Sequence, residues 1–512
     1  MYKYVEKLIE NKKKGEIKRF GTLFSTKNKN YFYDTGTGKV VELDNDGLKI
    51  MKCLFDEEIV IKNVEDLICL STRDNVHKFN QEIKEYKILQ GKEPQRFYSA
   101  NYYENFENKV ENELEQIILE LTGKCNLRCK YCIYNDAYIY NRSFNNCDMT
   151  QEIAKAGVDY LYEHSRNSKK KAITFYGGEP LIKFDLLKWT IDYARKLFKD
   201  DVAFSLTTNL TLVTEDIASY FGTVPNLTVV ASLDGPEIIQ NKCRVYADGR
   251  ETFIDAIRGL KLITEKMRDN DTSSIMINAV YTPPYSMEGI HSIMEFFDSL
   301  DFLPENIGVQ ITYPTSGSYE VKNDYEIKDE RDKNPLWEWI KEATKEKSLT
   351  TEKNRKYATS MFNALTRIHN RFLVDEPVDY YPFHSCCIPG VRRLYINSEG
   401  NFYVCEKIGD SPSIGDVRNG INIKNVKDYY IDGYNKNMIN TCKNCWAIRL
   451  CHSCYVDRYD TKGFRQGFNF NSCDNEREAV KNELILYHSL LENNPEKIEE
   501  ISKGLTDTLV TC

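Results

Sequence analysis

Three cysteines with close spacing follow an apolar run in the first half of the chain. Cys125, Cys129 and Cys132 are separated by three and by two residues, directly after the run at 117–122. Thiolates at this spacing can hold three irons of a cubane iron-sulfur cluster, which leaves the fourth iron free to chelate a small molecule. A structural zinc site is the alternative, but zinc sites usually take four ligands arranged in pairs. The triplet therefore favours a cluster with one open, reactive iron.

Polar motifs with possible binding roles follow later apolar runs. Gly177 and Gly178 would let backbone approach a ligand closely, and Glu179 offers a carboxylate to an ammonium group or to neighbouring donors. Arg244 can grip a carboxylate through two parallel hydrogen bonds. Taken singly, a Gly-Gly pair is usually a turn and an arginine is usually a solvated surface group. The functional interpretation therefore depends on the motifs occurring together.

In this order the motifs resemble those of the radical S-adenosylmethionine (SAM) enzymes. The resemblance implies that Tyr134 lies over the adenine of SAM and that the segment Gly177, Gly178 and Glu179 contacts its methionine amino group. It also implies that Ser232 and Arg244 hold the ribose and the methionyl carboxylate, as in the peptide-modifying branch. In that family the cluster donates one electron to SAM, and the resulting 5'-deoxyadenosyl radical abstracts a hydrogen from the substrate.

A second set of cysteines lies in the last quarter of the chain. It comprises Cys386, Cys387, Cys405 after Gly400, then Cys442, Cys445, Cys451 and Cys454, and finally Cys473. This order resembles the SPASM extension, which usually holds two auxiliary 4Fe-4S clusters and would bring the total to three. The interval before Cys454 is two residues where the family has three. A zinc ribbon is the alternative, because two Cys-x2-Cys pairs are compatible with zinc.

The resemblance also distributes the ligands between the two auxiliary clusters. Cys442, Cys445, Cys451 and Cys473 would hold the distal cluster, while Cys454 crosses to the nearer one and joins Cys405 there. Either Cys386 or Cys387 would complete that set, and Cys387 ranks first. Adjacent cysteines on an extended backbone point to opposite sides. The nearer cluster is therefore expected to have three firm protein ligands and a possible open iron.

The stretch that carries the first motifs alternates predicted strands with predicted helices. The strands are expected at 117–122, 172–176, 203–207, 227–232, 275–280 and 307–311, and helices at 186–198, 253–267, 287–300 and from 150 onward. Such alternation predicts an α/β fold with parallel strands and right-handed crossovers. Its length fits a partial (β/α)6 TIM-like barrel, whose active site gathers at the carboxyl ends of the strands. Thr208 and Asn209 follow one of these strands and are further candidates for the pocket.

The first 95 residues combine three short strands with three helical segments. This pattern predicts a small winged-helix-like unit, which resembles the leader-recognition element of ribosomal-peptide maturases. In that family the leader of a precursor peptide adds as an extra strand to the sheet edge. A DNA-binding winged helix is the competing interpretation, but the candidate recognition helix at 79–86 is mixed in charge.

Length and composition limit the remaining choices. With 512 residues, we expect a recognition unit at 1–95, the barrel at 96–312, a bridging region at 313–384 and the SPASM unit at 385–512. A formal charge of -8 argues against nucleic acid as a partner. No apolar stretch approaches the ~20 residues of a membrane span, and the start lacks a signal peptide's apolar region, so a cytoplasmic protein is expected. Sixteen cysteines in a reducing compartment favour metal clusters over disulfides.

The favoured hypothesis is a peptide maturase that joins a cysteine sulfur to a carbon of a ribosomal precursor, as sactipeptide and ranthipeptide synthases do. An open iron on the nearer auxiliary cluster would bind and deprotonate the substrate thiol. The resemblance also implies a cellular reductant such as flavodoxin or ferredoxin. Carbon-carbon crosslinking and formylglycine formation, as in anaerobic sulfatase maturation, are alternatives. A winged-helix iron-sulfur or zinc regulator that binds DNA is the non-enzymatic one.

Overall fold

The computed structural model of the chain describes residues 2–136, 138–305, 307–315, 317–319, 334–346, 351, 356–409, 411–465 and 471–499. Parts of the predicted bridging region at 313–384 and the end of the predicted unit at 385–512 lie outside these residues. Within them, no helix is both long enough and apolar enough to span a bilayer.

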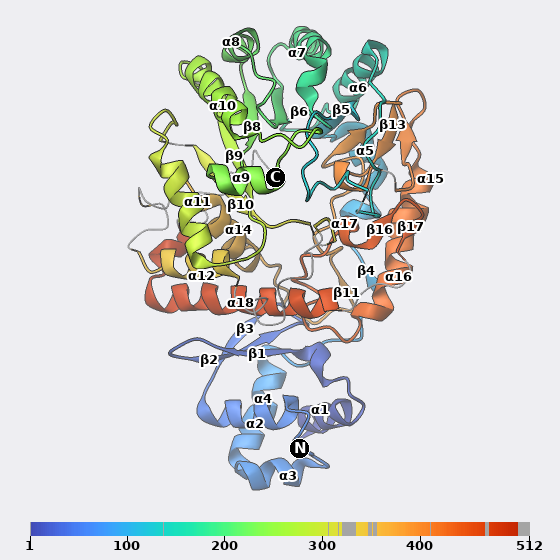
Figure 1. The fold of residues 1–512 in the computed structure, drawn as a ribbon. Coiled ribbons are helices and arrows are strands. Elements are labelled where there is room, and N and C mark those ends of the chain that lie inside the picture. The colour runs from blue at the N-terminus through green and yellow to red at the C-terminus, as the bar shows by residue number, and fades with distance from the viewer. Residues whose placement is uncertain are drawn as a thin grey trace.

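Six parallel strands form the barrel portion, and all six lie where the sequence predicts them (Figure 1). They are β5 (Gln116–Thr122), β6 (Ala172–Gly177), β7 (Ala203–Thr208), β8 (Leu227–Ser232), β9 (Ser274–Val280) and β10 (Gly308–Thr312). The helices of this part are α6 (Gln151–His164), α7 (Phe184–Phe198), α8 (Glu215–Thr223), α9 (Glu237–Cys243), α10 (Phe253–Met267) and α11 (Met287–Ser299), with the 3₁₀ turn η3 (Pro180–Lys183). Helix α8, which lies between β7 and β8, was not predicted. The predicted order of the strands is nevertheless the observed one.

Side chains in these strands alternate between two environments. In β6, Ile173 and Phe175 are fully buried in the core, while Thr174 and Tyr176 are only half-buried and line a cavity on the other face. The same alternation holds in β7, where Phe204 and Leu206 are buried. The inner face of the partial barrel therefore mixes polar and apolar side chains, while its outer face is apolar.

The sheet continues beyond β5 into the C-terminal part of the chain, which the sequence did not predict. Strand β12 (Leu394–Ile396) pairs parallel to β5, with Tyr395 opposite Ile118. Strands β13 (Asn401–Tyr403), β14 (Gly415–Asp416) and β15 (Gly420–Ile421) extend it antiparallel to ten strands in all. The six-stranded barrel expected from the sequence is thus part of a larger mixed sheet, and the cysteine-rich C-terminal part is hydrogen-bonded to its edge.

The N-terminal part has a hydrophobic core of its own. It contains α1 (Lys3–Lys13), η1 (Ile17–Phe20), β1 (Gly21–Ser25), β2 (Asn30–Asp34), β3 (Val40–Leu43), α2 (Asn45–Phe55), α3 (Val64–Leu70) and α4 (Arg73–Tyr86). The three strands form an antiparallel sheet with β2 in the middle. Asp44 caps α2 by accepting a hydrogen bond from the Gly47 backbone N–H (2.7 Å).

Helix α18 (Asn471–Asn493) lies between the N-terminal part and the rest of the molecule (Figure 1). Its His488 ring packs against Phe24 and Tyr31 of the small sheet, each with a centroid separation of 5.2 Å. The remaining elements are β4 (Arg96–Phe97), η2 (Ala100–Tyr102), α5 (Phe106–Asn112), α12 (Pro335–Ala343), α14 (Ala358–His369), β11 (Tyr380–Tyr381), η4 (Glu406–Ile408), α15 (Ile423–Asn425), η5 (Val426–Ile431), α16 (Asp432–Cys442), α17 (Tyr455–Arg458), β16 (Tyr459–Asp460) and β17 (Gly463–Phe464).

Candidate active site

One cavity of about 910 Å³ inside the partial barrel brings the predicted barrel residues together. The predicted residues that line it are Cys125, Cys129, Cys132, Tyr134, Gly177, Gly178, Glu179, Thr208, Asn209, Ser232 and Arg244. They come from loops that follow different strands and, for Ser232, from the end of β8. The carboxyl ends of parallel strands meet at one edge of a sheet, which explains why motifs more than 100 residues apart converge here.

The cysteine loop, residues 125–132, is held against the segment that carries Arg244. Arg128 donates its backbone N–H to the Val245 carbonyl (2.8 Å), and Lys130 donates to the Cys243 carbonyl (3.0 Å). The Leu127 backbone N–H donates to Cys125 Sγ (3.4 Å). Because the loop and the Arg244 segment are joined, any group that the three thiols hold lies within one cavity with the guanidinium.

The three thiols are held in a setting suited to a metal cluster. Burial raises the pKa of Cys125 and of Cys129 to about 12 and raises that of Cys132 as well. Thiolates in such surroundings need a positive partner, and metal binding supplies one as it displaces the protons. The Arg244 guanidinium lowers the pKa of all three thiols. The donor set and its charge therefore fit an iron-sulfur cluster.

Gly177 and Gly178 also allow a close contact between two backbone segments, which the sequence did not predict. A Cβ on Gly178 would lie 1.9 Å from the Lys124 carbonyl oxygen, and one on Gly177 would lie 2.3 Å from that of Thr122. The Gly178 N–H donates to the Thr122 carbonyl (2.8 Å), and the next residue donates to that of Lys124 (2.9 Å). The glycines thus allow the end of β6 to pack against the strand end that leads into the cysteine loop. Glycine is needed at positions 177 and 178 because a Cβ atom there would clash with these carbonyl oxygens, and both residues also line the cavity.

Glu179 is buried, and both of its oxygens already accept hydrogen bonds. Oε1 accepts from Thr208 Oγ1 (2.9 Å) and the Leu181 N–H (3.1 Å), while Oε2 accepts from the Asn209 N–H (2.7 Å). Burial raises the pKa of this carboxyl group, whereas these three donors lower it. Glu179 therefore ties the end of β6 to that of β7, and its remaining lone pairs border the cavity.

Arg244 is the member of the site with an unused donor. It is 8% exposed, and its Nη1 donates to the Tyr131 hydroxyl (2.8 Å), which in turn donates to Asp234 Oδ2 (2.6 Å). Its Nε is buried and has no hydrogen-bond partner among the described residues. A buried N–H donor without an acceptor lowers the stability of the fold, so a ligand that supplies an acceptor here gains binding free energy. The motifs gave no role to Tyr131 or Asp234, which orient this guanidinium; their only signal in the sequence was that they lie inside two of the motifs.

Tyr134 lies in an aromatic and cationic setting. The Arg142 guanidinium lies 4.0 Å from the centroid of its ring, and Phe144 and Tyr176 approach it edge-on. Arg142 in turn forms a buried ion pair with Glu120 on β5. The position of Tyr134 in the cavity wall agrees with the expectation that it lies beside a ligand, but Arg142 occupies one face of its ring.

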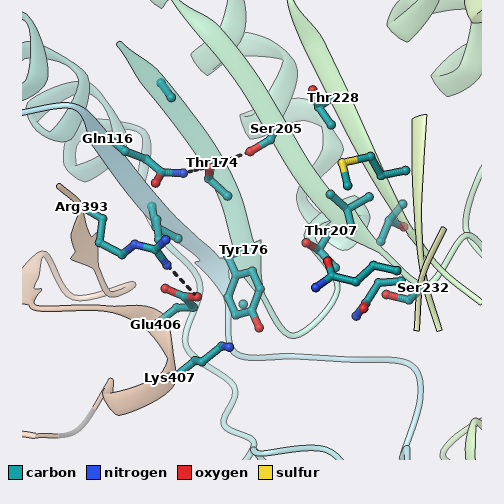
Figure 2. A pocket seen from close by; sticks show the side chains of 18 of the residues that line it. Gln116, Thr174, Tyr176, Ser205, Thr207, Thr228, Ser232, Arg393, Glu406 and Lys407 are labelled. Atoms are coloured by element: carbon teal, nitrogen blue, oxygen red, sulfur yellow. Dashed lines mark hydrogen bonds and ion pairs between the residues drawn. The ribbon is translucent and has the colours of Figure 1, made fainter. Parts of the chain in front are cut away.

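Three charged residues from the C-terminal part also line the cavity (Figure 2). Arg393 pairs with Glu406 Oε1 (3.5 Å), and Lys407 lies beside them. Glu406 Oε2 is buried and has no hydrogen-bond partner among the described residues. No sequence motif pointed to these residues, because only the pairing of β12 with β5 brings them to the barrel.

Polar side chains on the inner face of the strands line the deeper part of the cavity. Gln116 donates to Thr174 Oγ1 (2.6 Å), and Thr174 shares a hydrogen bond with the Ser205 hydroxyl (2.7 Å; Figure 2). The cavity reaches residues 169–172 and 200–203, at the amino ends of β6 and β7. Polar residues at alternate positions of β6 and β7, such as Thr174 and Ser205, are the sequence signal for this wall, which the motifs alone did not indicate.

Four of the C-terminal cysteines are neighbours of one another, and we call them the distal group: Cys442, Cys445, Cys451 and Cys473. Burial raises the pKa of Cys442 most, and the adjacent thiols of Cys445 and Cys451 raise it further. Arg477 Nη1 lies 3.8 Å from Cys445 Sγ, and Arg458 Nη2 lies 3.9 Å from Cys473 Sγ. Two cationic donors therefore face this group of thiols.

The other four, Cys386, Cys387, Cys405 and Cys454, form what we call the nearer group. Burial raises the pKa of Cys386, and the adjacent Cys454 and Cys387 thiols add to that shift. Burial also raises the pKa of Cys405, which has Glu406 and Cys454 beside it. The chain turns at His384 (φ 51°) and is not in a strand at Cys386 or Cys387.

No three His, Cys, Asp or Glu side chains of the described residues converge closely enough to hold a single metal ion. A cubane cluster instead requires thiols that surround a larger body, with one thiol at each ligated iron.

Comparison with known proteins shows that residues 119–297 match the Radical SAM superfamily. A cysteine-type anaerobic sulfatase-maturating enzyme from Clostridium novyi is 25% identical over 418 residues, which cover 77% of this chain and 98% of that protein. The radical SAM cyclopropyl synthase TigE from Paramaledivibacter caminithermalis is 26% identical over 44% of this chain and 50% of its own length.

An uncharacterised protein from Methanocaldococcus jannaschii is 26% identical over 61% of this chain and 93% of its own length. Among solved structures, anSMEcpe with bound AdoMet and Cp18Cys peptide is similar in fold, with a TM-score of 0.53 and 20% identity over 76% of this chain and 99% of that one.

Proposed function

We propose that the chain, whose residues 119–297 match the Radical SAM superfamily, is a radical SAM enzyme that modifies a ribosomally made peptide. The observation that carries the proposal is the convergence of the cysteine loop, Glu179 and an Arg244 with an unused buried donor in one cavity. The relatives named above that have assigned activities include a sulfatase-maturating enzyme and a cyclopropyl synthase.

In this proposal Cys125, Cys129 and Cys132 hold the first 4Fe-4S cluster and Arg244 takes the methionyl carboxylate of SAM. Ser232 faces the ribose, Tyr134 lies beside the adenine, and Glu179 accepts from the methionine ammonium group. Once bound, the cluster and SAM supply an electron and a carbon-centred radical, which is chemistry that protein side chains do not provide. The protein's task is to orient the reactants and exclude water.

The finer proposal is thioether formation between a cysteine sulfur and a carbon of the peptide. The reaction removes a hydrogen atom from carbon, which SAM-derived 5'-deoxyadenosine carries away, and a proton from the thiol. Glu406 lines the cavity, and its Oε2 has no hydrogen-bond partner in the described part of the chain, so in this proposal it accepts that proton. One electron remains, and the nearer cysteine group would hold the cluster that takes it.

The nearer group consists of Cys405, Cys454 and one or both of Cys386 and Cys387. If only one of Cys386 and Cys387 is a ligand, one iron of this cluster has no protein ligand and could bind the substrate thiol. If both are ligands, all four irons are ligated by protein. The distal group would hold the second auxiliary cluster. Iron and sulfide analysis of Cys386→Ser and Cys387→Ser variants, with the spectrum of the nearer cluster, distinguishes the two sets.

Formylglycine formation is the second candidate, because the Clostridium novyi sulfatase-maturating enzyme aligns over 98% of its own length. That reaction also removes two hydrogens from the substrate residue before water enters. The first 95 residues favour the thioether-forming maturase, since a sulfatase maturase does not need a leader-recognition unit.

The N-terminal part is proposed to bind the precursor's leader. Strand β3 pairs with β2 alone, and no other described residue forms a hydrogen bond with the backbone of 40–43. An edge with free backbone groups can accept a peptide as a further strand. Binding of a fluorescent leader peptide, compared with duplex DNA at several salt concentrations, separates this role from the DNA-binding alternative.

Incubation of the reduced, cluster-loaded enzyme with SAM and a cysteine-containing precursor tests the proposal. We expect 5'-deoxyadenosine together with a mass loss of two hydrogens per bridge and protection of the bridged thiols from alkylation. A product with an aldehyde that reacts with hydrazides would indicate formylglycine instead. Intact SAM under strong reductant, in protein that contains iron and sulfide, would contradict the radical mechanism itself.

A further inference from the structure

The outer side of the cysteine loop carries positive charge that no carboxylate neutralises. Arg128 and Lys130 are exposed, and Lys242 is half-buried beside them. Their cationic groups donate to backbone carbonyls: Arg128 Nη1 to Cys125 (2.7 Å) and Leu127 (2.8 Å), Lys130 Nζ to Lys242 (2.6 Å), and Lys242 Nζ to Pro283. Among the described residues, none of the three cations forms an ion pair with Asp or Glu. We call these three residues the basic patch.

Charges around the basic patch do not cancel it. Lys124 and Lys183 share one carboxylate, Asp148, at 2.9 and 3.2 Å, which leaves a further positive charge. The nearby pairs Arg250 with Asp248 (2.8 Å) and Arg258 with Asp255 (3.7 Å) are balanced. Three exposed acids of the same segments form no ion pair in the described part of the chain: Asp136, Glu237 and Glu251. The whole chain has a formal charge of -8. The basic patch therefore has the opposite sign from the molecule's net charge.

The position of the basic patch is as informative as its sign. Arg128 and Lys130 alternate in sequence with Cys129, and the three cysteines of the loop line the cavity while both cations are exposed. The guanidinium of Arg128 donates directly to the Cys125 carbonyl. A protein seated on this surface would be separated from the group held by the three thiols only by the thickness of one loop.

We propose that Arg128, Lys130 and Lys242 dock an acidic one-electron carrier protein over the cysteine loop. The inference rests on the proposed function, which requires an external electron. One electron passes from the carrier's reduced cofactor to the cluster that Cys125, Cys129 and Cys132 would hold. The carrier is oxidised by one electron, and no proton or covalent bond is exchanged. Opposite surface charges accelerate such encounters and set their orientation.

The test uses reduced flavodoxin as the probe and the cluster-loaded full-length enzyme. The variant Lys130→Glu/Lys242→Glu reverses two charges of the basic patch and leaves Arg128, which supports the loop, in place. Its control is Lys196→Glu/Lys436→Glu, because Lys196 and Lys436 are exposed, form no ion pair in the described part of the chain, and give the same change in net charge. We expect binding to flavodoxin to weaken at least roughly tenfold in the first variant and to stay unchanged in the control.

Salt provides a second readout of the binding. Raising the ionic strength from about 0.01 M to about 1 M shortens the screening length from ~30 Å to ~3 Å. Wild-type affinity for flavodoxin should fall steeply over this range, and that of the reversed variant should change much less. The neutral variant Lys130→Gln/Lys242→Gln should give intermediate affinity, and it serves if the reversed variant does not retain its iron.

SAM cleavage distinguishes failure of docking from failure of the proposed function. Dithionite is a small reductant that needs no docking surface, so the ratio of the SAM cleavage rate with flavodoxin to that with dithionite should fall in the reversed variant and stay at the wild-type value in the control. Equal flavodoxin binding by wild type and reversed variant would overturn the docking proposal. If the wild type cleaves no SAM even with dithionite, the proposed function fails, while the binding measurement still decides whether the basic patch docks the carrier.

Discussion

At the level of single residues, Arg244 combines burial with an unused donor, which makes it the most informative position for SAM binding. The change Arg244→Gln removes the cation and the Nε donor that awaits an acceptor. A charge-assisted hydrogen bond of this kind contributes about 1.5–3 kcal/mol, so SAM binding should weaken roughly 10- to 100-fold. Equilibrium dialysis with cluster-loaded protein measures this, and Tyr131→Phe is the matched control because it removes only the hydroxyl that orients the guanidinium. Equal SAM affinity in wild type and Arg244→Gln would remove the assignment.

Glu406 offers a test of the proton step that leaves SAM chemistry intact. Glu406→Gln keeps the shape of the side chain but cannot accept a proton from the substrate thiol. We expect 5'-deoxyadenosine to form at close to the wild-type rate while bridged peptide falls roughly 100-fold, within the usual range for the loss of a general base. Mass spectrometry of both products measures the ratio, and Glu406→Asp should recover part of the bridging. Normal bridging in Glu406→Gln would show that another group takes the proton.

Most residues of the barrel site could be predicted from the sequence because each belongs to a short motif after a predicted strand. Cys125, Glu179 and Arg244 are examples, and the cavity contains all three. Glu406 could not be predicted, because its place in the cavity wall depends on the pairing of the three-residue strand β12 with β5, more than 270 residues earlier in the chain. Short-range patterns carry no information about such a pairing.

At the level of elements, Gly178 joins the end of β6 to the cysteine loop. In Gly178→Ala the new methyl group would lie 1.9 Å from the Lys124 carbonyl oxygen, so the backbone must move. We expect a loss of about 3 kcal/mol or more and reduced iron content after cluster loading. Iron analysis and thermal unfolding measure these effects. Gly308→Ala in β10 is the matched control, because its methyl group would meet only ordinary contacts at 3.8 Å; similar iron loss in both variants would contradict the explanation.

His488 makes the contact between α18 and the small sheet sensitive to pH. Burial lowers the pKa of this imidazole to about 4, below its usual value of about 6.5. Between these values the unfolded chain binds the proton and the folded chain does not, so acidification destabilises the fold. At pH 5 the loss relative to pH 7 is about 2 kcal/mol. Comparing wild type with His488→Asn by urea unfolding isolates this contribution.

Other groups titrate in both proteins and cancel in that comparison. The stability difference between wild type and His488→Asn should therefore shift against the wild type by about 2 kcal/mol on going from pH 7 to pH 5. A difference independent of pH would mean that the imidazole is protonated in the fold.

The strands and most helices of the barrel could be predicted from the sequence since apolar runs and caps are local signals. Helix α10 matches its predicted range at both ends, and Thr150 caps α6 through the Ile153 N–H (3.3 Å). The sheet's extension was missed because β12 to β15 are two or three residues long, too short to show a period of two.

At the level of the whole molecule, Arg449 joins the N-terminal part to the cysteine-rich part. It is buried, and its guanidinium donates to the carbonyls of Thr35 (3.1 Å), Gly36 (2.9 Å) and Phe372 (3.4 Å). Arg449→Met leaves these acceptors without their donor and should cost roughly 3 kcal/mol of docking energy. Limited proteolysis should then cut sooner between residues 87 and 95. Arg73→Met, at an exposed ion pair with Glu65, should leave the cleavage rate unchanged; equal rates in both variants would contradict the role of Arg449.

Helix α18 has a consequence for how the protein comes to be made. One end of the helix carries Cys473 of the distal group, and the other carries His488 and Glu492, which hold the small sheet at Phe24 and Tyr31. The small sheet of β1 to β3 can therefore reach its final packing only after the ribosome has made α18. Until then the sheet depends on the separate hydrophobic core of the N-terminal part, and a chain cut before α18 would lose a thiol of the distal group and the contacts of His488 and Glu492 together.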